Sequence, residues 1–457
     1  MRKPFLISLL FAGLSLSVSA QQSDSAVFRS IYSEVLVNGE CYDKLDYLCN
    51  EIGGRLAGSP GAAAAVEYTR QVMEQYDFDT VWLQPVMVPH WVRGEKEAVR
   101  LLSQKKGSFD VPATALGNSV GTGPDGVRAQ VLEVKSFEEL EKLGKKAVEG
   151  KIVFFNRPMD PTKILTFQAY GGAVDQRVFG ASKAAALGAK AVLVRSMTTA
   201  LDDVPHTGTL RYDEAQPKIP ALAISTNGAE QLSQLLKAEP TLQVYVESHC
   251  EMLPDVLSYN VIGEITGQEF PDEYIVVGGH LDAWDNGDGA HDDGSGCVQS
   301  IEVLRTFKAL GIRPRHSLRA VMYMNEENGL RGGLAYAAEA RAKDEKHIAA
   351  IESDAGGFSP LGFSHQGSPA VTQKLQSWQP LFAPYNVFLF YAGGGGADIG
   401  PLAEQGVELF GFRPDPQRYF DYHHTSIDTF DKISKRELEL GAATMAALVY
   451  LIDTRGL

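Results

Sequence analysis

The stretch Tyr274–Gly296, YIVVGGHLDAWDNGDGAHDDGSG, is the most informative part of the sequence. Its first five residues form a continuous apolar run, which is typical of a strand that is buried on both faces of a sheet. The triplet His280–Asp282 follows where that strand should end. A glycine-rich segment that contains Asp292 and Asp293 follows, and a helix is predicted over 295–310. Glycines in such a segment allow the backbone to approach a ligand closely. A strand, a polar loop and a helix in this order predict an α/β sheet.

The rest of the C-terminal part repeats this order. From about residue 257 onward, apolar strands alternate with amphipathic helices. We therefore predict a mixed, mostly parallel α/β sheet with helices on both faces. The predicted strands are 274–278, 318–324, 348–351 and 407–412, and the predicted helices are 295–310, 332–343 and 435–452.

The middle of the chain has a different texture. Between about residues 105 and 246, short β-rich runs alternate with short helical patches, and none of the runs ends in a cluster of His, Asp and Glu. We expect an inserted α/β module with no chemistry of its own. The predicted organisation is an N-terminal part of the main domain at 21–104, the inserted domain at 105–250 and the catalytic part at 251–457. The N-terminal part contains predicted helices at 25–37, 40–52 and 61–76 and a predicted strand at 80–88.

The first twenty residues have the pattern of a cleaved signal peptide. Arg2 and Lys3 precede an apolar run at Phe5–Leu16, and Val18–Ala20 supplies a cleavage site. We expect an exported protein, periplasmic or secreted, whose mature chain starts at Gln21. No later stretch approaches the roughly 18 apolar residues that a membrane span needs, so no stable span is expected.

Composition limits the partners. The chain of 457 residues carries 42 Lys and Arg against 57 Asp and Glu, a formal net charge of −15. Nucleic-acid binding depends on basic surface, so no nucleic-acid partner is expected. Four Cys residues are too few for a disulfide framework, and we expect buried free thiols.

Chemistry-bearing residues follow the predicted strands of the C-terminal part at the point where each strand ends. In open α/β sheets, ligands bind beyond the carboxyl ends of the strands. Each residue alone has an ordinary explanation, such as a solvated face or a helix cap. Together they favour a cation, because charges at the ends of buried strands need partners that offset their desolvation. The residues are His280, Asp282, Asp292, Glu326, Glu327, Asp354 and His424.

The residue types favour zinc. Two His and several carboxylates suit Zn²⁺, with Mn²⁺ or Co²⁺ as substitutes, whereas Mg²⁺ and Ca²⁺ prefer shells made only of oxygen. More carboxylates are present than one tetrahedral ion uses, which indicates two ions that share a bridging carboxylate. Such a pair activates water and polarises a carbonyl, and a nearby carboxylate must carry the proton to the leaving amine. This is the chemistry of amide hydrolysis.

These residues, in this order, closely resemble the co-catalytic zinc exopeptidases of peptidase family M28. Three stretches narrow the resemblance to one branch of that family: GGRLAGSPG at 53–61, LQPVMVPHWVRG at 83–94, and residues 278–293. The similarity covers almost the whole mature chain. It implies the zinc exopeptidase fold, with a protease-associated (PA) domain inserted at the position of the middle module.

The resemblance also implies how the metal ligands are shared. Asp292 would bridge both ions. His280 and Asp354 would complete the shell of one ion, and Glu327 and His424 would complete the shell of the other.

Two further carboxylates have catalytic roles in this interpretation. Glu326 would be the general base that takes a proton from the attacking water, and Asp282 would hydrogen-bond to His280 and fix its ring. In many members of the family the bond between the two Asp residues is cis, and we expect the same at Asp292–Asp293.

Three residues are predicted to bind the substrate. His423 stands where many relatives carry a Tyr that stabilises an oxyanion, and its imidazole either donates in the same way or is a neutral spectator. Asp398 either faces the substrate or caps a helix, and Arg413 either pairs with a substrate carboxylate or lies on the surface. Asp428 is expected to hold the His424 loop by hydrogen bonding.

The predicted function is an exported dizinc exopeptidase that hydrolyses short peptides or dipeptides. An aminopeptidase of the same family is an alternative, because the motifs do not decide which end of the peptide is preferred. A single-zinc acyltransferase of the glutaminyl cyclase type is a more distant alternative. A receptor that has lost catalysis is disfavoured, because every ligand position is filled. The resemblance also suggests a homodimer.

Overall fold

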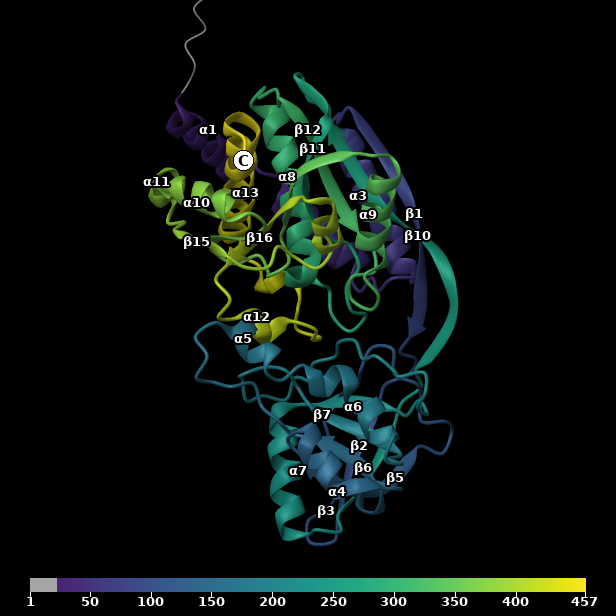
Figure 1. Ribbon diagram of the computed structural model, residues 1–457. Helices are drawn as coiled ribbons and strands as arrows, with labels where there is room; N and C mark the ends of the chain where they lie inside the picture. The colour runs from purple at the N-terminus through teal and green to yellow at the C-terminus, as the bar shows by residue number, and fades with distance from the viewer. Residues whose placement is uncertain (1–22) are drawn as a thin grey trace, which may run out of the picture.

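The computed structural model describes residues 23–457, and the predicted signal peptide at 1–20 lies outside the described residues. The chain forms two lobes, each built around its own sheet (Figure 1). The upper lobe contains the N-terminal and C-terminal parts of the chain, and the lower lobe contains the middle. Within residues 23–457, no helix is long and apolar enough to cross a membrane.

A mixed sheet of eight strands forms the centre of the upper lobe. Its order is β1-β10-β12-β11-β13-β16-β14-β15, and the central strands β12, β11, β13 and β16 run parallel. Antiparallel pairs flank them on both sides. The strands are β1 (Thr80–Val92), β10 (Glu251–Ile265), β11 (Phe270–His280), β12 (His316–Tyr323), β13 (Lys346–Glu352), β14 (Pro360–Gln366), β15 (Leu389–Ala392) and β16 (Glu408–Pro414).

Helices cover both faces of this sheet, as predicted. Along β11, Ile275 and Val277 pack in one core with α1, α2, α3, α8 and α13, whereas Val276 packs in another with α9 and η4. The helices are α1 (Asp24–Asn38), α2 (Cys41–Tyr47), η1 (Leu48–Ile52), α3 (Pro60–Gln75), η2 (Ala290–Gly294), α8 (Ser295–Ala309), α9 (Arg331–Ala342), α10 (Pro369–Ser377), α11 (Gln379–Phe382), η3 (Ala383–Tyr385), η4 (Gly400–Gln405), α12 (Tyr419–Tyr422), η5 (Phe430–Lys432) and α13 (Lys435–Arg455). All four Cys side chains are buried and free, as expected.

A second mixed sheet forms the lower lobe. Its order is β3-β2-β9-β5-β6-β7-β8-β4, with β5 to β8 parallel. The strands are β2 (Ala98–Ser103), β3 (Gly107–Val111), β4 (Ala113–Ala115), β5 (Val127–Val134), β6 (Ile152–Phe155), β7 (Ala191–Arg195), β8 (Ala221–Ile224) and β9 (Gln243–Glu247). β2 begins before residue 105, so this sheet starts earlier in the chain than the predicted boundary.

The lower sheet also has helices on both faces. Phe155 of β6 packs in a core with α4 and α6, whereas the preceding Phe154 packs in a core with α7. The helices of this lobe are α4 (Phe137–Val148), α5 (Thr166–Gly171), α6 (Asp175–Ala185) and α7 (Thr226–Ala238).

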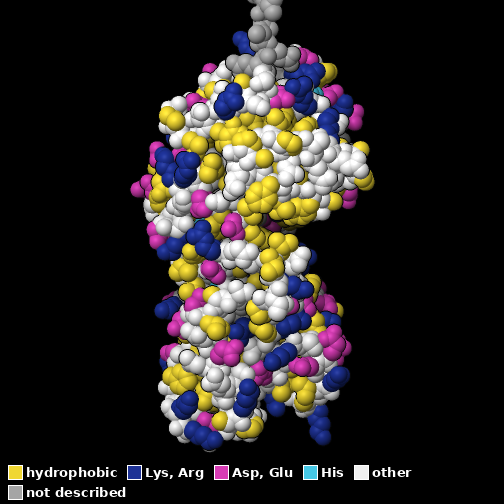
Figure 2. Space-filling model, turned by 90° about the vertical axis from the view of Figure 1, so that its left-hand side faces the viewer, with side chains coloured by type: hydrophobic (Ala, Val, Ile, Leu, Met, Phe, Trp, Pro, Cys, Tyr) yellow, Lys and Arg dark blue, Asp and Glu magenta, His cyan; other side chains and the backbone are white. Residues whose placement is uncertain are grey.

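Two of the contacts between the lobes can be followed along the secondary structure. The long antiparallel strands β1 and β10 run from one lobe to the other (Figure 1). On the opposite side, α5 of the lower lobe packs on α12 of the upper lobe. Phe167 stacks on Tyr419 with ring centroids 5.3 Å apart, and Tyr170 stacks on Phe420 at 4.7 Å. Figure 2 shows the narrower waist between the lobes, where apolar side chains reach the surface.

Candidate metal centre

The predicted ligands follow strands whose carboxyl ends lie side by side. His280 ends β11, Glu326 and Glu327 follow β12, and Asp354 follows β13. His424 follows α12, which comes after β16 in the chain. These four strands are neighbours and run parallel, so their carboxyl ends deliver the side chains to one edge of the sheet.

Asp292 lies between two imidazoles. Its Oδ1 is 3.2 Å from Nε2 of His280, and its Oδ2 is 3.3 Å from Nε2 of His424. The same nitrogen of His280 is 3.6 Å from Oδ1 of Asp354, and that of His424 is 3.1 Å from Oε2 of Glu327. The structure therefore brings the five predicted ligands together in two clusters that share Asp292, one with His280 and Asp354 and the other with His424 and Glu327.

His423 lies beside the second cluster. Its Nε2 is 3.7 Å from Oδ2 of Asp292, and its ring stacks on that of His424 with centroids 3.5 Å apart. These three residues offer ligand atoms that all lie within 4.8 Å of one another. His423 thus lies next to the ligands of the second cluster and also lines the cavity described below.

Burial dominates the electrostatics of the site. Burial raises the pKa of Glu326 to about 8, and the carboxylates of Asp354 and Asp292 add to the rise. Burial holds the pKa of His424 well below its usual value, so this imidazole is neutral. At His280 burial lowers the pKa, but the neighbouring carboxylates outweigh it and the pKa rises well above its usual value. Carboxylates crowded into a buried site need positive charge, and a cation supplies it.

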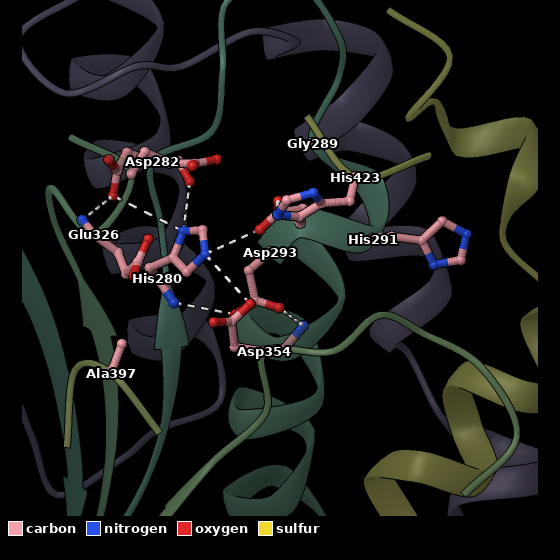
Figure 3. A network of polar contacts seen from close by, with 12 residues as sticks. His280, Asp282, Gly289, His291, Asp293, Glu326, Asp354, Ala397 and His423 are labelled. Atoms are coloured by element: carbon pink, nitrogen blue, oxygen red, sulfur yellow. Dashed lines mark hydrogen bonds and ion pairs between the residues drawn. The ribbon is translucent and has the colours of Figure 1, made fainter. Parts of the chain in front are cut away.

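Asp282 holds His280 differently from the prediction. Nδ1 of His280 is 2.9 Å from the main-chain carbonyl oxygen of Asp282 and 4.0 Å from its Oδ1 (Figure 3). The Asp282 carboxylate instead accepts hydrogen bonds from the N–H groups of Asn325, at 2.7 Å, and Glu326, at 3.0 Å. The carbonyl of Asp282 therefore orients the imidazole, and its side chain fixes the turn that carries Glu326. Oδ2 of Asp293 accepts from the His280 N–H at 3.1 Å.

Asp292 is held through its backbone. Its peptide bond to Asp293 is cis, as the resemblance implied. The carboxylate of Asp428 accepts hydrogen bonds from the N–H groups of His291, at 2.8 Å, and Asp292, at 3.1 Å. Asp428 was expected to hold the His424 loop by hydrogen bonding, and its N–H does donate to the carbonyl of Thr425 at 3.3 Å, while its carboxylate holds the segment that presents Asp292.

A buried guanidinium braces the loop between His280 and Asp292. Arg55 is 0% exposed and donates to the carbonyl oxygens of Leu281 at 2.6 Å, Asp288 at 2.5 Å and Gly289 at 2.9 Å. It belongs to the GGRLAGSPG stretch, to which the sequence assigned no role beyond the resemblance.

Two predicted substrate contacts are not supported by the structure. Asp398 is 1% exposed and does not line the cavity, and η4 is not capped by its side chain. Arg413 donates to Oγ of Ser364 at 2.9 Å and to the carbonyl of Gly394 at 2.8 Å, so it braces the glycine-rich loop behind the site. Neither residue faces the space in front of the two clusters.

A cavity of about 640 Å³ opens in front of the two clusters, and the lower lobe forms part of its wall. The expectation that the inserted module has no chemistry of its own stays a prediction, but the module does supply residues to this cavity. Nη2 of Arg177 donates to Oη of Tyr170 at 2.7 Å, and Nη1 lies 3.4 Å from Nδ1 of His424. Arg177 is 5% exposed, and its Nε has no hydrogen-bond partner among residues 23–457. The lower lobe supplies Asn118, Phe167, Tyr170, Arg177, Thr209 and Arg211 to the lining.

Comparisons with known proteins agree with this geometry. The model of "Peptidase family M28" matches residues 260–449. Carboxypeptidase Q of Mus musculus is 33% identical over 465 residues, which covers 98% of this chain and 96% of that protein. A crystal structure of a peptidase M28 precursor from Shewanella amazonensis SB2B has a TM-score of 0.89 at 32% identity and covers 94% of this chain and 96% of that one.

BSAP, a zinc aminopeptidase from Bacillus subtilis, shares the fold with a TM-score of 0.64 at 21% identity, over 90% of this chain and 94% of its own. The branch of the family that the three sequence stretches indicated is thus that of carboxypeptidase Q. Similarity over nearly the full length, together with two His/Asp clusters that share one carboxylate, establishes that this chain belongs to peptidase family M28 and is a metallo-exopeptidase.

Proposed function

We propose that this chain is a dizinc exopeptidase that hydrolyses short peptides with a free carboxylate. One observation carries the proposal: both oxygens of Asp292 face an imidazole nitrogen, at 3.2 Å for His280 and 3.3 Å for His424. A carboxylate flanked in this way is the arrangement that a bridging ligand between two ions needs.

The residues fit a pair of zinc ions. Each ion would have one imidazole nitrogen and one carboxylate of its own, from His280 and Asp354 or from His424 and Glu327, and both would share Asp292. Among residues 23–457, Oε1 of Glu327 and Oδ2 of Asp292 are buried without a hydrogen-bond partner. Buried carboxylate oxygens without donors are costly, and coordination of a cation removes that cost.

Glu326 is placed to move the proton. When bound, the two ions supply a nucleophilic water at neutral pH and polarise the scissile carbonyl. Glu326 lines the cavity beside the two clusters and is held by the bond from its N–H to Asp282. The charge of bound ions would favour the ionised form of Glu326, whose carboxylate would take the proton of the attacking water and deliver it to the leaving amine.

Arg177 supports a preference for substrates with a free carboxylate. Its guanidinium is buried in the cavity wall, and among residues 23–457 no carboxylate forms an ion pair with it. A buried Arg binds a carboxylate through charge-assisted hydrogen bonds, and the α-carboxylate of a bound dipeptide offers that partner.

The test combines metal analysis with two substitutions. Glu326→Gln should retain two zinc ions and lose about 10²–10⁴-fold in kcat, because only the proton transfer is removed. Glu141→Gln, at an exposed position on α4, is the matched control. Arg177→Met should raise the KM for a free dipeptide about 10–150-fold. The KM for the same dipeptide with a C-terminal amide should not change. A wild-type protein without zinc, or Glu326→Gln with normal kcat, would contradict the proposal.

Two alternatives from the sequence give different results in the same assays. An aminopeptidase cleaves C-terminally blocked peptides as well as free ones. In that case Arg177→Met would leave the KM for both kinds of peptide unchanged. An acyltransferase of the glutaminyl cyclase type needs one zinc ion and cyclises N-terminal Gln. A panel of free, N-blocked and C-blocked dipeptides, with zinc measured on the same sample, separates the three.

We propose export as well, on the basis of the charged, apolar and small-residue pattern of residues 1–20. N-terminal sequencing of the protein from its native host should find Gln21 first, and an intact Met1 would contradict export by cleavage. The homodimer stays a prediction.

A further inference from the structure

His424 has a strained backbone conformation. Its φ is +63°, in the left-handed region that costs non-glycine residues roughly 1–2 kcal/mol. Within its own lobe, the N–H of His423 donates to Tyr419 and that of Thr425 to Tyr422. Such a conformation persists where surrounding groups enforce it. The groups that bind the carbonyls of His423 and His424 come from the other lobe.

Two consecutive residues of the lower lobe bind two consecutive carbonyls of this loop. Nδ1 of His206 lies 2.9 Å from the carbonyl oxygen of His423. The N–H of Thr207 donates to the carbonyl oxygen of His424 at 2.9 Å. Both contacts are buried, since His206 is 1% exposed and Thr207 is 0% exposed. Burial lowers the pKa of His206 to about 4, so the ring is neutral and its Nδ1–H is the donor.

The segment that makes these contacts is itself fixed within the lower lobe. The N–H of His206 donates to Oγ of Ser196 at 2.9 Å, and Oγ1 of Thr207 donates to the carbonyl of Ala115 at 2.7 Å. The segment 206–208 therefore presents two donors from a rigid frame.

The third residue of the segment must be small. A Cβ atom on Gly208 would lie 2.5 Å from Nδ1 of His424, and its φ of +123° disfavours any other residue. Only glycine allows the backbone to pass this close to the imidazole.

We infer that the segment 206–208 of the lower lobe is a positioning element that holds His424 in its left-handed conformation and so aims Nε2 at Glu327 and Asp292. The inference rests on the proposed function, in which His424 is a metal ligand. It gives the inserted lobe a second task, besides lining the cavity: it completes the geometry of one of the two metal sites. Groups that orient a metal-ligating His typically change metal affinity 10–100-fold when removed.

The experiment removes one donor and keeps an aromatic ring at the position. His206→Phe leaves the His423 carbonyl unpaired, whereas His206→Asn places an amide N–H close to the position of Nδ1 and should rescue. Ser233→Ala is the matched control, because it removes a buried hydrogen bond to Glu133 within the same lobe and away from the site. The readouts are the two zinc dissociation constants and the visible absorption of the Co²⁺-substituted protein.

We expect His206→Phe to weaken one zinc site about 10–100-fold and to change the absorption of Co²⁺ at that site, with the other site unchanged. His206→Asn should restore both within about threefold, and Ser233→Ala should leave both as in the wild type. If His206→Phe does not fold, His206→Gln moves the donor by one bond and should show the same loss. Wild-type affinity and absorption in His206→Phe or His206→Gln would overturn the inference. A wild-type protein that binds no zinc would instead overturn the proposed function.

Discussion

Arg55→Met tests whether the buried guanidinium braces the metal-site loop. The substitution keeps most of the apolar stem but removes the donors to Leu281, Asp288 and Gly289. Hydrogen bonds from a charged group contribute about 1.5–3 kcal/mol each, which gives roughly 4.5–9 kcal/mol for three. The substitution also removes a buried positive charge whose acceptors are carbonyl groups and not a carboxylate. The desolvation penalty that is thereby avoided offsets several kcal/mol of the loss in stability. We expect a net loss of about 3–5 kcal/mol in the free energy of unfolding.

The assay is urea unfolding of the metal-free protein. Trp284 lies in the braced loop and is buried, so it contributes to the change in fluorescence together with the other three Trp residues. Arg70→Met is the matched control, because within residues 23–457 Arg70 pairs only with Glu67 and Glu74 on the surface of α3, and exposed pairs contribute about 0.2–1 kcal/mol. If Arg55→Met loses no more stability than Arg70→Met, the bracing role is wrong.

Three further predictions follow from the same geometry. Asp292→Ala should lose both zinc ions, whereas Glu327→Ala should lose only the ion beside His424. Metal analysis after dialysis checks both expectations, and two ions retained in Asp292→Ala would disprove the bridge. Burial lowers the pKa of His347 from 6.5 to about 4, so the unfolded chain binds the extra proton between those values and stability falls as pH drops through that window. At pH 4.5 the loss is about 2–3 kcal/mol. His347→Leu should flatten the pH dependence of unfolding measured from pH 7 to 4.5, whereas parallel curves for the variant and the wild type would contradict the prediction. Gly117→Ala should lower the free energy of unfolding by about 1–3 kcal/mol, because its Cβ would lie 1.8 Å from the Trp284 ring. Gly400→Ala is the control, because a Cβ there meets no atom within 4 Å. Equal thermal midpoints for the two variants would contradict the prediction.

The sequence predicted the sheet and the ligand cluster for one physical reason. Apolar runs such as YIVVG mark buried parallel strands, and the polar residues directly after such strands must gather at one edge of the sheet. His280, Glu327 and Asp354 each stand at the end of a strand in this way. The order of the strands in the sheet therefore brings them close to Asp292, and the directions of their side chains matter little.

The residues that the sequence missed or misplaced depend on features that no local pattern encodes. Arg177 and His206 reach the site because the two lobes pack together, and neither lies in a periodic or motif context of its own. Asp398 and Arg413 lie close to the site in the chain, but Asp398 is buried and the half-buried Arg413 turns to Ser364 and Gly394, and packing sets both directions. Arg55 stood in a recognisable stretch, but its acceptors are more than 200 residues away.

The most direct measurement is a crystal structure of the purified protein with diffraction data collected at the zinc absorption edge. We expect two anomalous peaks about 3.5–4 Å apart, each within coordination distance of one oxygen of Asp292. One peak, no peak, or two peaks of which Asp292 contacts neither would contradict the shared-carboxylate centre.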